Sequence, residues 1–389
     1  MLNFDFYTPT KVFFGKDRHK ELGKIISGYG YKKIMLQYGK GSIKTTGLYD
    51  EIMSSIAEYN IEVTELGGVE PNPKIEFIRN AIQIAREQNV ELILAVGGGS
   101  VIDAAKYTAL GAVADCDIWD FVTGKEKPKF ALPVGSVLTI AAAGSEMSAS
   151  AVVTDMSLNM KRGFTSELIR PLFAVCNPEL TYTVSPYQTA CGISDIMAHT
   201  MERYFTPCEP VNITDQIAES ILRTVIDAAY TVIKEPQNYE ARANIMWASS
   251  LSHNNLTGCG RINALPVHQL EHAVSGEYDN VAHGAGLAVL FPAWGEYVYK
   301  HNISRFSRFA RQVWGVSDPD DKTAAEKGIA AMAEFFKFIG MPSTLSEFGI
   351  GNEAVDRLTN LCTFNGSRTV KSVIELGESE IKAIFQRCF

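Results

Sequence analysis

Short apolar runs that end in glycine-rich turns organise the first 184 residues of this sequence. The run at 33–37 leads into Tyr-Gly-Lys-Gly-Ser, and the run at 92–96 leads into Gly-Gly-Gly-Ser. Between them, residues 75–88 carry apolar side chains at helical spacing. Short buried strands that alternate with helices are typical of a parallel sheet with helices on both faces. We expect further strands at 132–138 and 172–176.

The pattern changes after residue 184. Ser185, Pro186 and Gln188 form a helix-start signal, with the serine as cap and the proline at the first helical position. Long helical patterns follow at 214–233, 239–254, 303–314 and 323–339, without strand-like alternation of comparable length. The sequence therefore predicts an α/β dinucleotide-binding domain with a Rossmann-like parallel sheet over residues 1–184. It predicts an all-α domain over residues 185–389.

Composition excludes several classes of protein. Lys and Arg number 36 against 44 Asp and Glu, a net charge of −8, which disfavours a nucleic-acid partner. No long uncharged apolar run is present, and the start lacks the order of a signal peptide. We therefore expect a cytoplasmic protein with no membrane partner. Its seven cysteines are scattered without a CxxC pair, which favours reduced thiols over a disulfide framework or a thiolate metal site.

The glycines at 97–99 lie where a predicted strand meets a predicted helix. Glycine lets a backbone approach a phosphate closely, and the N–H groups that begin a helix favour an anion. The alternative is a tight strand-to-helix turn without a ligand. The segment matches neither GxGxxG nor the GxxxxGK[ST] phosphate loop, so these two motifs give no support.

The end of the earlier strand bears on cofactor choice. An acidic residue near such a position often binds the ribose 2′-hydroxyl of NAD. Residues 38–44 contain no Asp or Glu, but they contain Lys40, Ser42 and Lys44. Small residues and a cation suit a 2′-phosphate better, although a solvated lysine loop remains the alternative.

Aspartate and histidine residues recur at four-residue spacing in the second half. Asp195 and His199 are four apart, as are His268 and His272, and His283 follows. Residues four apart share one face of a helix, so each pair is a possible half-site for a divalent metal. Each histidine alone is more often an ordinary core or surface residue. Ligands that are all oxygen or nitrogen favour Zn²⁺ or Fe²⁺.

These segments together resemble the iron-containing (group III) alcohol dehydrogenases, within them the NADPH-dependent butanol dehydrogenase or aldehyde reductase branch. The likeness runs almost end to end. Its landmarks are 8–10 with 14–15, 38–42, 69–73, 97–100 with Asp103, 144–146, 177–181, Asp195 with His199, His268 with His272, and 283–284.

The resemblance implies a cleft site between the two domains, NADP(H), one divalent ion (Fe²⁺ or Zn²⁺), an aldehyde or primary alcohol substrate and a homodimer. Its metal ligands fall on Asp195, His199, His268 and His283, and its additional active-site histidine on His272. The implied nucleotide contacts are Gly39, Lys40, Gly41, Ser42, Gly98, Gly99, Ser100, Asp103, Thr139, Ser148, Lys161, Leu180 and Thr183.

Two departures from the family pattern stand out. Ala143 occupies the position of a threonine whose hydroxyl is expected near the cofactor, which puts one cofactor hydrogen bond in doubt. Residues 273–282 form a segment one residue longer than expected before His283, which weakens the assignment of that ligand.

The predicted reaction is metal-assisted hydride transfer between NADP(H) and an aldehyde or primary alcohol, with His272 as the candidate for proton transfer. An NAD-dependent glycerol or polyol dehydrogenase would favour an acidic residue within 38–44. A lyase like dehydroquinate synthase would need several basic residues near the metal, where 257–283 offers Arg261 alone. A binding protein without catalysis is disfavoured because the four ligands and His272 are intact.

Overall fold

The computed structural model describes residues 1–158, 160–208 and 210–389. It contains two compact units, one of Tyr7–Val184 and one of Met1–Phe6 with Ser185–Phe389. The first six residues thus differ from the predicted domain range. Their place in the helical unit is explained in part by the Leu2 N–H, which donates to the Gly260 carbonyl at 2.9 Å.

The unit Tyr7–Val184 is built on a six-stranded sheet in the order β1-β8-β5-β4-β2-β3, and every neighbouring pair is parallel. This confirms the predicted fold class. Its strands are β1 (Lys11–Phe14), β2 (Lys33–Tyr38), β3 (Glu62–Gly67), β4 (Leu92–Gly97), β5 (Val134–Leu138) and β8 (Phe173–Cys176).

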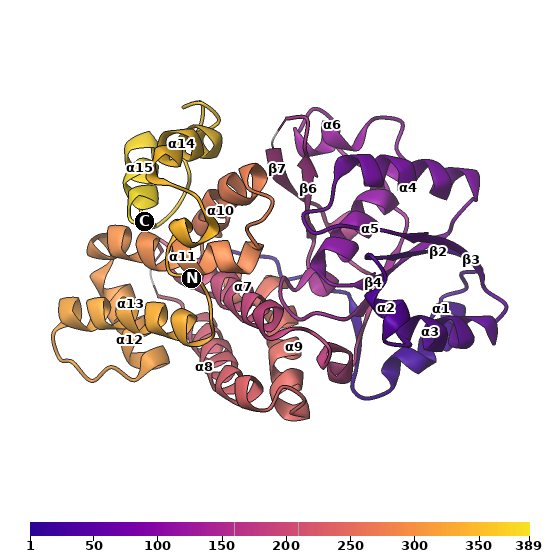
Figure 1. Ribbon diagram of the computed structural model, residues 1–389, viewed down its shortest axis with the longest axis horizontal. Helices are drawn as coiled ribbons and strands as arrows, with labels where there is room; N and C mark the ends of the chain where they lie inside the picture. The colour runs from indigo at the N-terminus through magenta and orange to yellow at the C-terminus, as the bar shows by residue number, and fades with distance from the viewer. Residues whose placement is uncertain (159, 209) are drawn as a thin grey trace. The chain divides into compact units, whose positions relative to one another are not determined.

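Helices cover both faces of this sheet (Figure 1). Alternate residues of the strands, such as Ile34 and Leu36, pack in one core cluster with α1 and α3 residues such as Ile26 and Ile52. α5 packs on β4 and also contacts α4. The helices are α1 (Leu22–Gly28), α2 (Ser42–Thr45), α3 (Leu48–Ala57), α4 (Ile75–Glu87), α5 (Gly99–Ala112) and α6 (Ile118–Val122).

A small antiparallel hairpin, β6 (Ser150–Asp155) with β7 (Met160–Thr165), was absent from the expected elements. Its strands pair from Ser150 with Thr165 to Asp155 with Met160. The backbone N–H of Val152 in β6 donates to the Asp103 carboxylate at 2.9 Å, which attaches the hairpin to α5.

The second unit is helical, as predicted from its sequence pattern. Its first helix begins where the cap signal indicated, because the Ser185 hydroxyl accepts from the Gln188 N–H and Pro186 opens the helix. The helices are α7 (Pro186–Tyr204), α8 (Asn212–Lys234), α9 (Tyr239–His253), α10 (Pro266–Glu277), α11 (His283–Val298), α12 (Ile303–Trp314), α13 (Asp321–Phe338), α14 (Val355–Thr363) and α15 (Glu378–Gln386).

Among the described residues, no helix combines the length and apolar character needed to cross a membrane.

Candidate metal centre

α7 holds the first two candidate ligands. Asp195 and His199 lie one turn apart on this helix, and both side chains are buried. The Asp195 Oδ1 atom lies 3.1 Å from the His199 Nδ1 atom. The four-residue spacing therefore does bring the carboxylate and the imidazole together.

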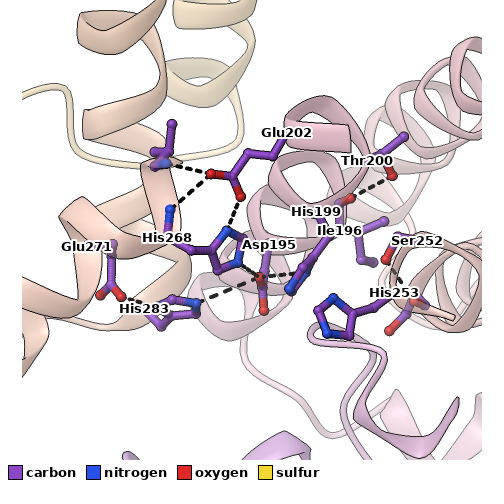
Figure 2. Close-up of polar contacts among 12 residues, drawn as sticks. Asp195, Ile196, His199, Thr200, Glu202, Ser252, His253, His268, Glu271 and His283 are labelled. Carbon is purple, nitrogen blue, oxygen red and sulfur yellow. Dashed lines mark hydrogen bonds and ion pairs between the residues drawn. The ribbon is translucent and has the colours of Figure 1, made fainter. Parts of the chain in front are cut away.

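Two further helices bring histidines to the same carboxylate oxygen. His268 of α10 places its Nε2 3.4 Å from Asp195 Oδ1, and His283, the first residue of α11, places its Nε2 3.9 Å from it. Figure 2 shows the three imidazoles directed toward Asp195. Three of the four residues predicted as metal ligands thus surround one oxygen atom of the fourth, Asp195.

Gly284 allows α11 to approach α7 closely. A Cβ atom at this position would lie 2.1 Å from the carbonyl oxygen of Cys191, a distance at which the two atoms clash. Backbone cannot yield as a flexible side chain can, so glycine is required next to His283. The glycine explains why the start of α11 reaches the Asp195 carboxylate.

The buried atoms at this centre fit a metal ion. Asp195 Oδ1, His199 Nδ1 and His268 Nε2 are buried, and none makes a hydrogen bond of acceptable geometry despite their proximity. Buried polar atoms in this state require an explanation, and a bound ion is one. Atoms of Asp195, His199 and His268 lie within 4.8 Å of one another, and the donor set of one carboxylate and imidazoles suits Zn²⁺ or Fe²⁺.

The electrostatics of the centre follow from burial and from these neighbours. Burial opposes ionisation of Asp195, but His199, His268 and His283 hold the pKa of this carboxyl well below its usual range. Burial lowers the pKa of His199 to about 3, which favours a neutral imidazole. Burial also opposes the charge on His268, yet the carboxylates of Glu202 and Asp195 raise its pKa to about 9.

Sequence reasoning missed two carboxylates that contact the histidines. Glu202 accepts from the Nδ1 of His268, and Glu271 accepts from the Nδ1 of His283 (Figure 2). Both glutamates are buried. A signal for Glu202 existed, since it follows His199 by three residues and therefore lies on the same face of α7. The same signal existed for Glu271, which follows His268 by three residues on α10.

His272 is half-buried and lies one turn after His268 on α10. Its ring centroid is 6.4 Å from that of His268 and 5.7 Å from that of His283. His272 can also form a second ligand group with Glu271 and His283, whose donor atoms lie within 4.8 Å of one another. Because the His283 Nε2 also lies 3.9 Å from Asp195 Oδ1, we treat the two groups as parts of one site.

The predicted cofactor residues all lie in the unit Tyr7–Val184. The loop 39–42 follows β2, and Gly98 with Ser100 lies where β4 passes into α5. Because β2 and β4 are parallel neighbours, these two segments lie at the same edge of the sheet. Thr139 follows β5 at that edge. The other predicted cofactor residues are Ser148 before β6, Lys161 in β7, and Leu180 and Thr183 after β8.

The glycines at 97–99 have packing roles beside any role in phosphate binding. A Cβ atom at Gly97 would lie 2.5 Å from the Val101 side chain, and one at Gly99 would lie 3.2 Å from Ala143 Cβ. Asp103 is also used within the protein, because its carboxylate accepts from Ser145 Oγ at 2.6 Å and from the Val152 N–H. These contacts support the tight-turn interpretation, and phosphate binding at this turn stays a prediction.

Acidic residues do lie near the 39–44 loop, although the loop itself has none. The Lys40 ammonium pairs with Glu70 at 2.8 Å, and the Lys44 ammonium pairs with Glu65 at 2.6 Å. Glu65 belongs to β3 and Glu70 follows it, and β3 is the parallel neighbour of β2. The interpretation that considered the end of β2 alone missed both carboxylates.

Comparison with known proteins assigns both units to the same family. The model of iron-containing alcohol dehydrogenases matches residues 9–178, and the model of the C-terminal part of the same family matches residues 189–389. The chain belongs to the iron-containing alcohol dehydrogenase family. This confirms the resemblance drawn from the motifs.

Individual relatives cover nearly the whole chain. It is 41% identical to NADH-dependent butanol dehydrogenase A of Clostridium acetobutylicum, with 100% of both chains covered. It is 37% identical to the NADPH-dependent aldehyde reductase YqhD of Escherichia coli, with 92% of both covered. The crystal structure of NADH-dependent butanol dehydrogenase A from Thermotoga maritima superimposes with a TM-score of 0.97 at 36% identity, covering 100% of this chain and 99% of that one.

Proposed function

We propose that this member of the family is a metal-dependent oxidoreductase that interconverts short-chain aldehydes and primary alcohols. The proposal rests on three buried side-chain atoms, of Asp195, His199 and His268, that could bind a metal and make no hydrogen bond. His283 lies beside them. The relatives named as butanol dehydrogenases and as an aldehyde reductase support this substrate class.

In the proposed reaction a hydride passes from the nicotinamide to the carbonyl carbon, and a proton passes to the carbonyl oxygen. A divalent ion, Fe²⁺ or Zn²⁺, held by Asp195, His199, His268 and His283 would supply Lewis-acid polarisation of that carbonyl. We assign the proton donor to His272, because it is half-buried next to His268 and His283 and because imidazole titrates near neutrality.

We further propose that NADP(H) is preferred over NAD(H). Support comes from the loop 38–44, which has no acidic side chain to repel a 2′-phosphate, and from the relative named as NADPH-dependent. Two observations oppose a strong preference. Lys40 is paired with Glu70, and several relatives are named as NADH-dependent. We therefore expect a modest preference.

The test is oxidation of NADPH with a panel of short aldehydes, by metal-free protein and by the same protein after addition of Fe²⁺ or Zn²⁺. We expect turnover to disappear without metal and to return with it. Full turnover by metal-free protein would refute the metal role. Equal or higher kcat/KM with NADH would refute the cofactor preference, and so would a Gly39→Asp variant with an unchanged preference.

Two further expectations belong to this proposal. A homodimer is expected, and β1 at the edge of the six-stranded sheet is a surface where a second chain can pair. Size-exclusion chromatography with light scattering tests it, and a monomer at micromolar concentration would contradict it. The cytoplasmic location stays a prediction.

A further inference from the structure

We infer that Glu202 and Glu271 are positioning residues for the metal, each of which fixes one histidine with its Nε2 directed at Asp195. This inference rests on the proposed metal site. The two glutamates contact the far side of each ring, at Nδ1, while Nε2 lies toward Asp195 Oδ1. A neutral imidazole that offers its Nε2 lone pair to a metal must carry its proton on Nδ1, and a carboxylate acceptor favours that tautomer.

Glu202 fixes more than the ring of His268. Its carboxylate also accepts from the backbone N–H groups of Val267 and His268, the latter at 3.1 Å. These N–H groups belong to the first turn of α10, where the helix itself provides no acceptor. A single side chain from α7 therefore sets both the start of α10 and the orientation of its ligand.

Glu271 performs the corresponding task between α10 and α11. It lies on α10 and contacts His283 at the first position of α11. Gly286 provides the space, since a Cβ atom there would lie 3.0 Å from Glu271 Cγ. A larger residue at position 286 would therefore displace the Glu271 side chain.

The contacts that hold His199 differ from those that hold His268 and His283. Its ring packs edge-on against His253 with centroids 4.0 Å apart. Arg203 donates to the His199 carbonyl at 2.8 Å and lies 3.1 Å from His253 Nδ1. Packing and a guanidinium therefore hold this region, whereas carboxylates hold the other two histidines.

The charges of the cluster also favour a dication. Asp195, Glu202 and Glu271 are three buried carboxylates, and the buried guanidinium of Arg203 lies near Glu202. A dication would balance these four groups, and buried charges are tolerated when they are paired or bound to metal. Loss of one positioning carboxylate should therefore weaken metal binding through both the ring orientation and the charge.

The experiment measures metal binding itself. Full-length wild-type, Glu202→Gln and Glu271→Gln proteins are freed of metal, and Zn²⁺ affinity is measured by competition with a chromophoric chelator. Outer carboxylates of this kind typically contribute 10- to 100-fold to affinity, so we expect a loss in that range for each variant. Co²⁺-loaded proteins provide a spectroscopic readout, and their visible absorption should change in both variants.

Glu219→Gln is the matched control. Glu219 of α8 is a buried glutamate of the same unit, and it pairs with Tyr204 at 2.9 Å and with Arg308 at 2.6 Å. We expect its Zn²⁺ affinity to remain within about twofold of wild type, a change of about 0.4 kcal/mol. Its Co²⁺ spectrum should be unchanged even if its Tm falls.

Each outcome decides the question. Wild-type affinity in Glu202→Gln and Glu271→Gln would overturn the inference and leave the proposed metal site intact, and an equal loss in the control would also overturn the inference. A wild-type protein that binds no Zn²⁺ or Co²⁺ would overturn the metal site itself and this inference with it. If Glu202→Gln does not fold, Glu271→Gln still decides, since Glu271 contacts the ring of the other histidine, His283.

Discussion

Glu70→Gln should increase the preference of this enzyme for NADPH. In the structure the Glu70 carboxylate pairs with the Lys40 ammonium at 2.8 Å, in the loop assigned to the cofactor ribose. A 2′-phosphate that reaches Lys40 must therefore compete with Glu70 and also face its negative charge. Replacement by glutamine removes this charge, and the ion pair to Lys40 with it, with little change in size.

The magnitude follows from the exposure of the pair. The side chains of Lys40 and Glu70 are 72% and 47% exposed, so solvent screens their interaction. Exposed ion pairs contribute about 0.2–1 kcal/mol, and 1 kcal/mol corresponds to about fivefold in binding. Because the phosphate carries up to about two negative charges, we expect a 2- to 10-fold lower KM for NADPH. The KM for NADH should be unchanged.

The assay is steady-state kinetics with both cofactors at saturating aldehyde and at two salt concentrations. The difference should shrink at high salt, because exposed charges are screened over about 8 Å at 0.15 M. Glu62→Gln is the matched control, because Glu62 pairs with Lys33 at 3.4 Å on the same two strands but at their opposite ends. An unchanged KM for NADPH, or the same effect in the control, would refute the reasoning.

Three other substitutions test the metal centre. His268→Ala should abolish stoichiometric metal and activity while the protein stays folded, and metal analysis showing full occupancy with full turnover would contradict the ligand assignment. His272→Ala should keep the metal but lower kcat and alter its pH dependence; loss of metal, or a normal rate, would exclude the proton role. Gly284→Ala should lower the free energy of unfolding by about 1–3 kcal/mol, because the added Cβ clashes with the Cys191 carbonyl oxygen. The same variant should bind Zn²⁺ more weakly. A wild-type Tm in a thermal melt would disprove the clash.

Much of the fold could be predicted because its signals are local. The helix at 303–314 was predicted with the bounds that α12 has, since its apolar and charged residues separate cleanly onto two faces. The start of α7 was predicted from Ser185 and Pro186, whose capping roles depend on adjacent residues alone. Buried strands such as β4 were visible as short apolar runs.

The strand β3, which was not among the predicted strands, lacks such a signal. β3 has the sequence EVTELG and is partly exposed at the edge of the sheet, so no apolar run marks it. Its identity depends on pairing with β2, a tertiary contact. The same pairing brings Glu65 and Glu70 to Lys44 and Lys40, which explains why the environment of the cofactor loop could not be read from residues 38–44.

The metal centre could likewise be predicted only in part. The four-residue spacing on one helix predicts that Asp195 and His199 lie together. The positions of His268 and His283 around the Asp195 oxygen depend on where α10 and α11 meet α7. Glu202 and Glu271 each follow a predicted ligand by three residues, but their contacts with His268 and His283 depend on how these helices pack.

α7 itself carries the strongest physical argument for a bound ion. It is buried along most of its length, yet Asp195, His199 and Glu202 occupy one face at spacings of four and three residues. Burial of an ionised carboxylate is costly unless a partner compensates it. Glu202 is compensated by the first turn of α10 and by His268, whereas Asp195 Oδ1 has no hydrogen bond and faces imidazole nitrogens. A cation at that oxygen would offset the cost of burying the Asp195 carboxylate.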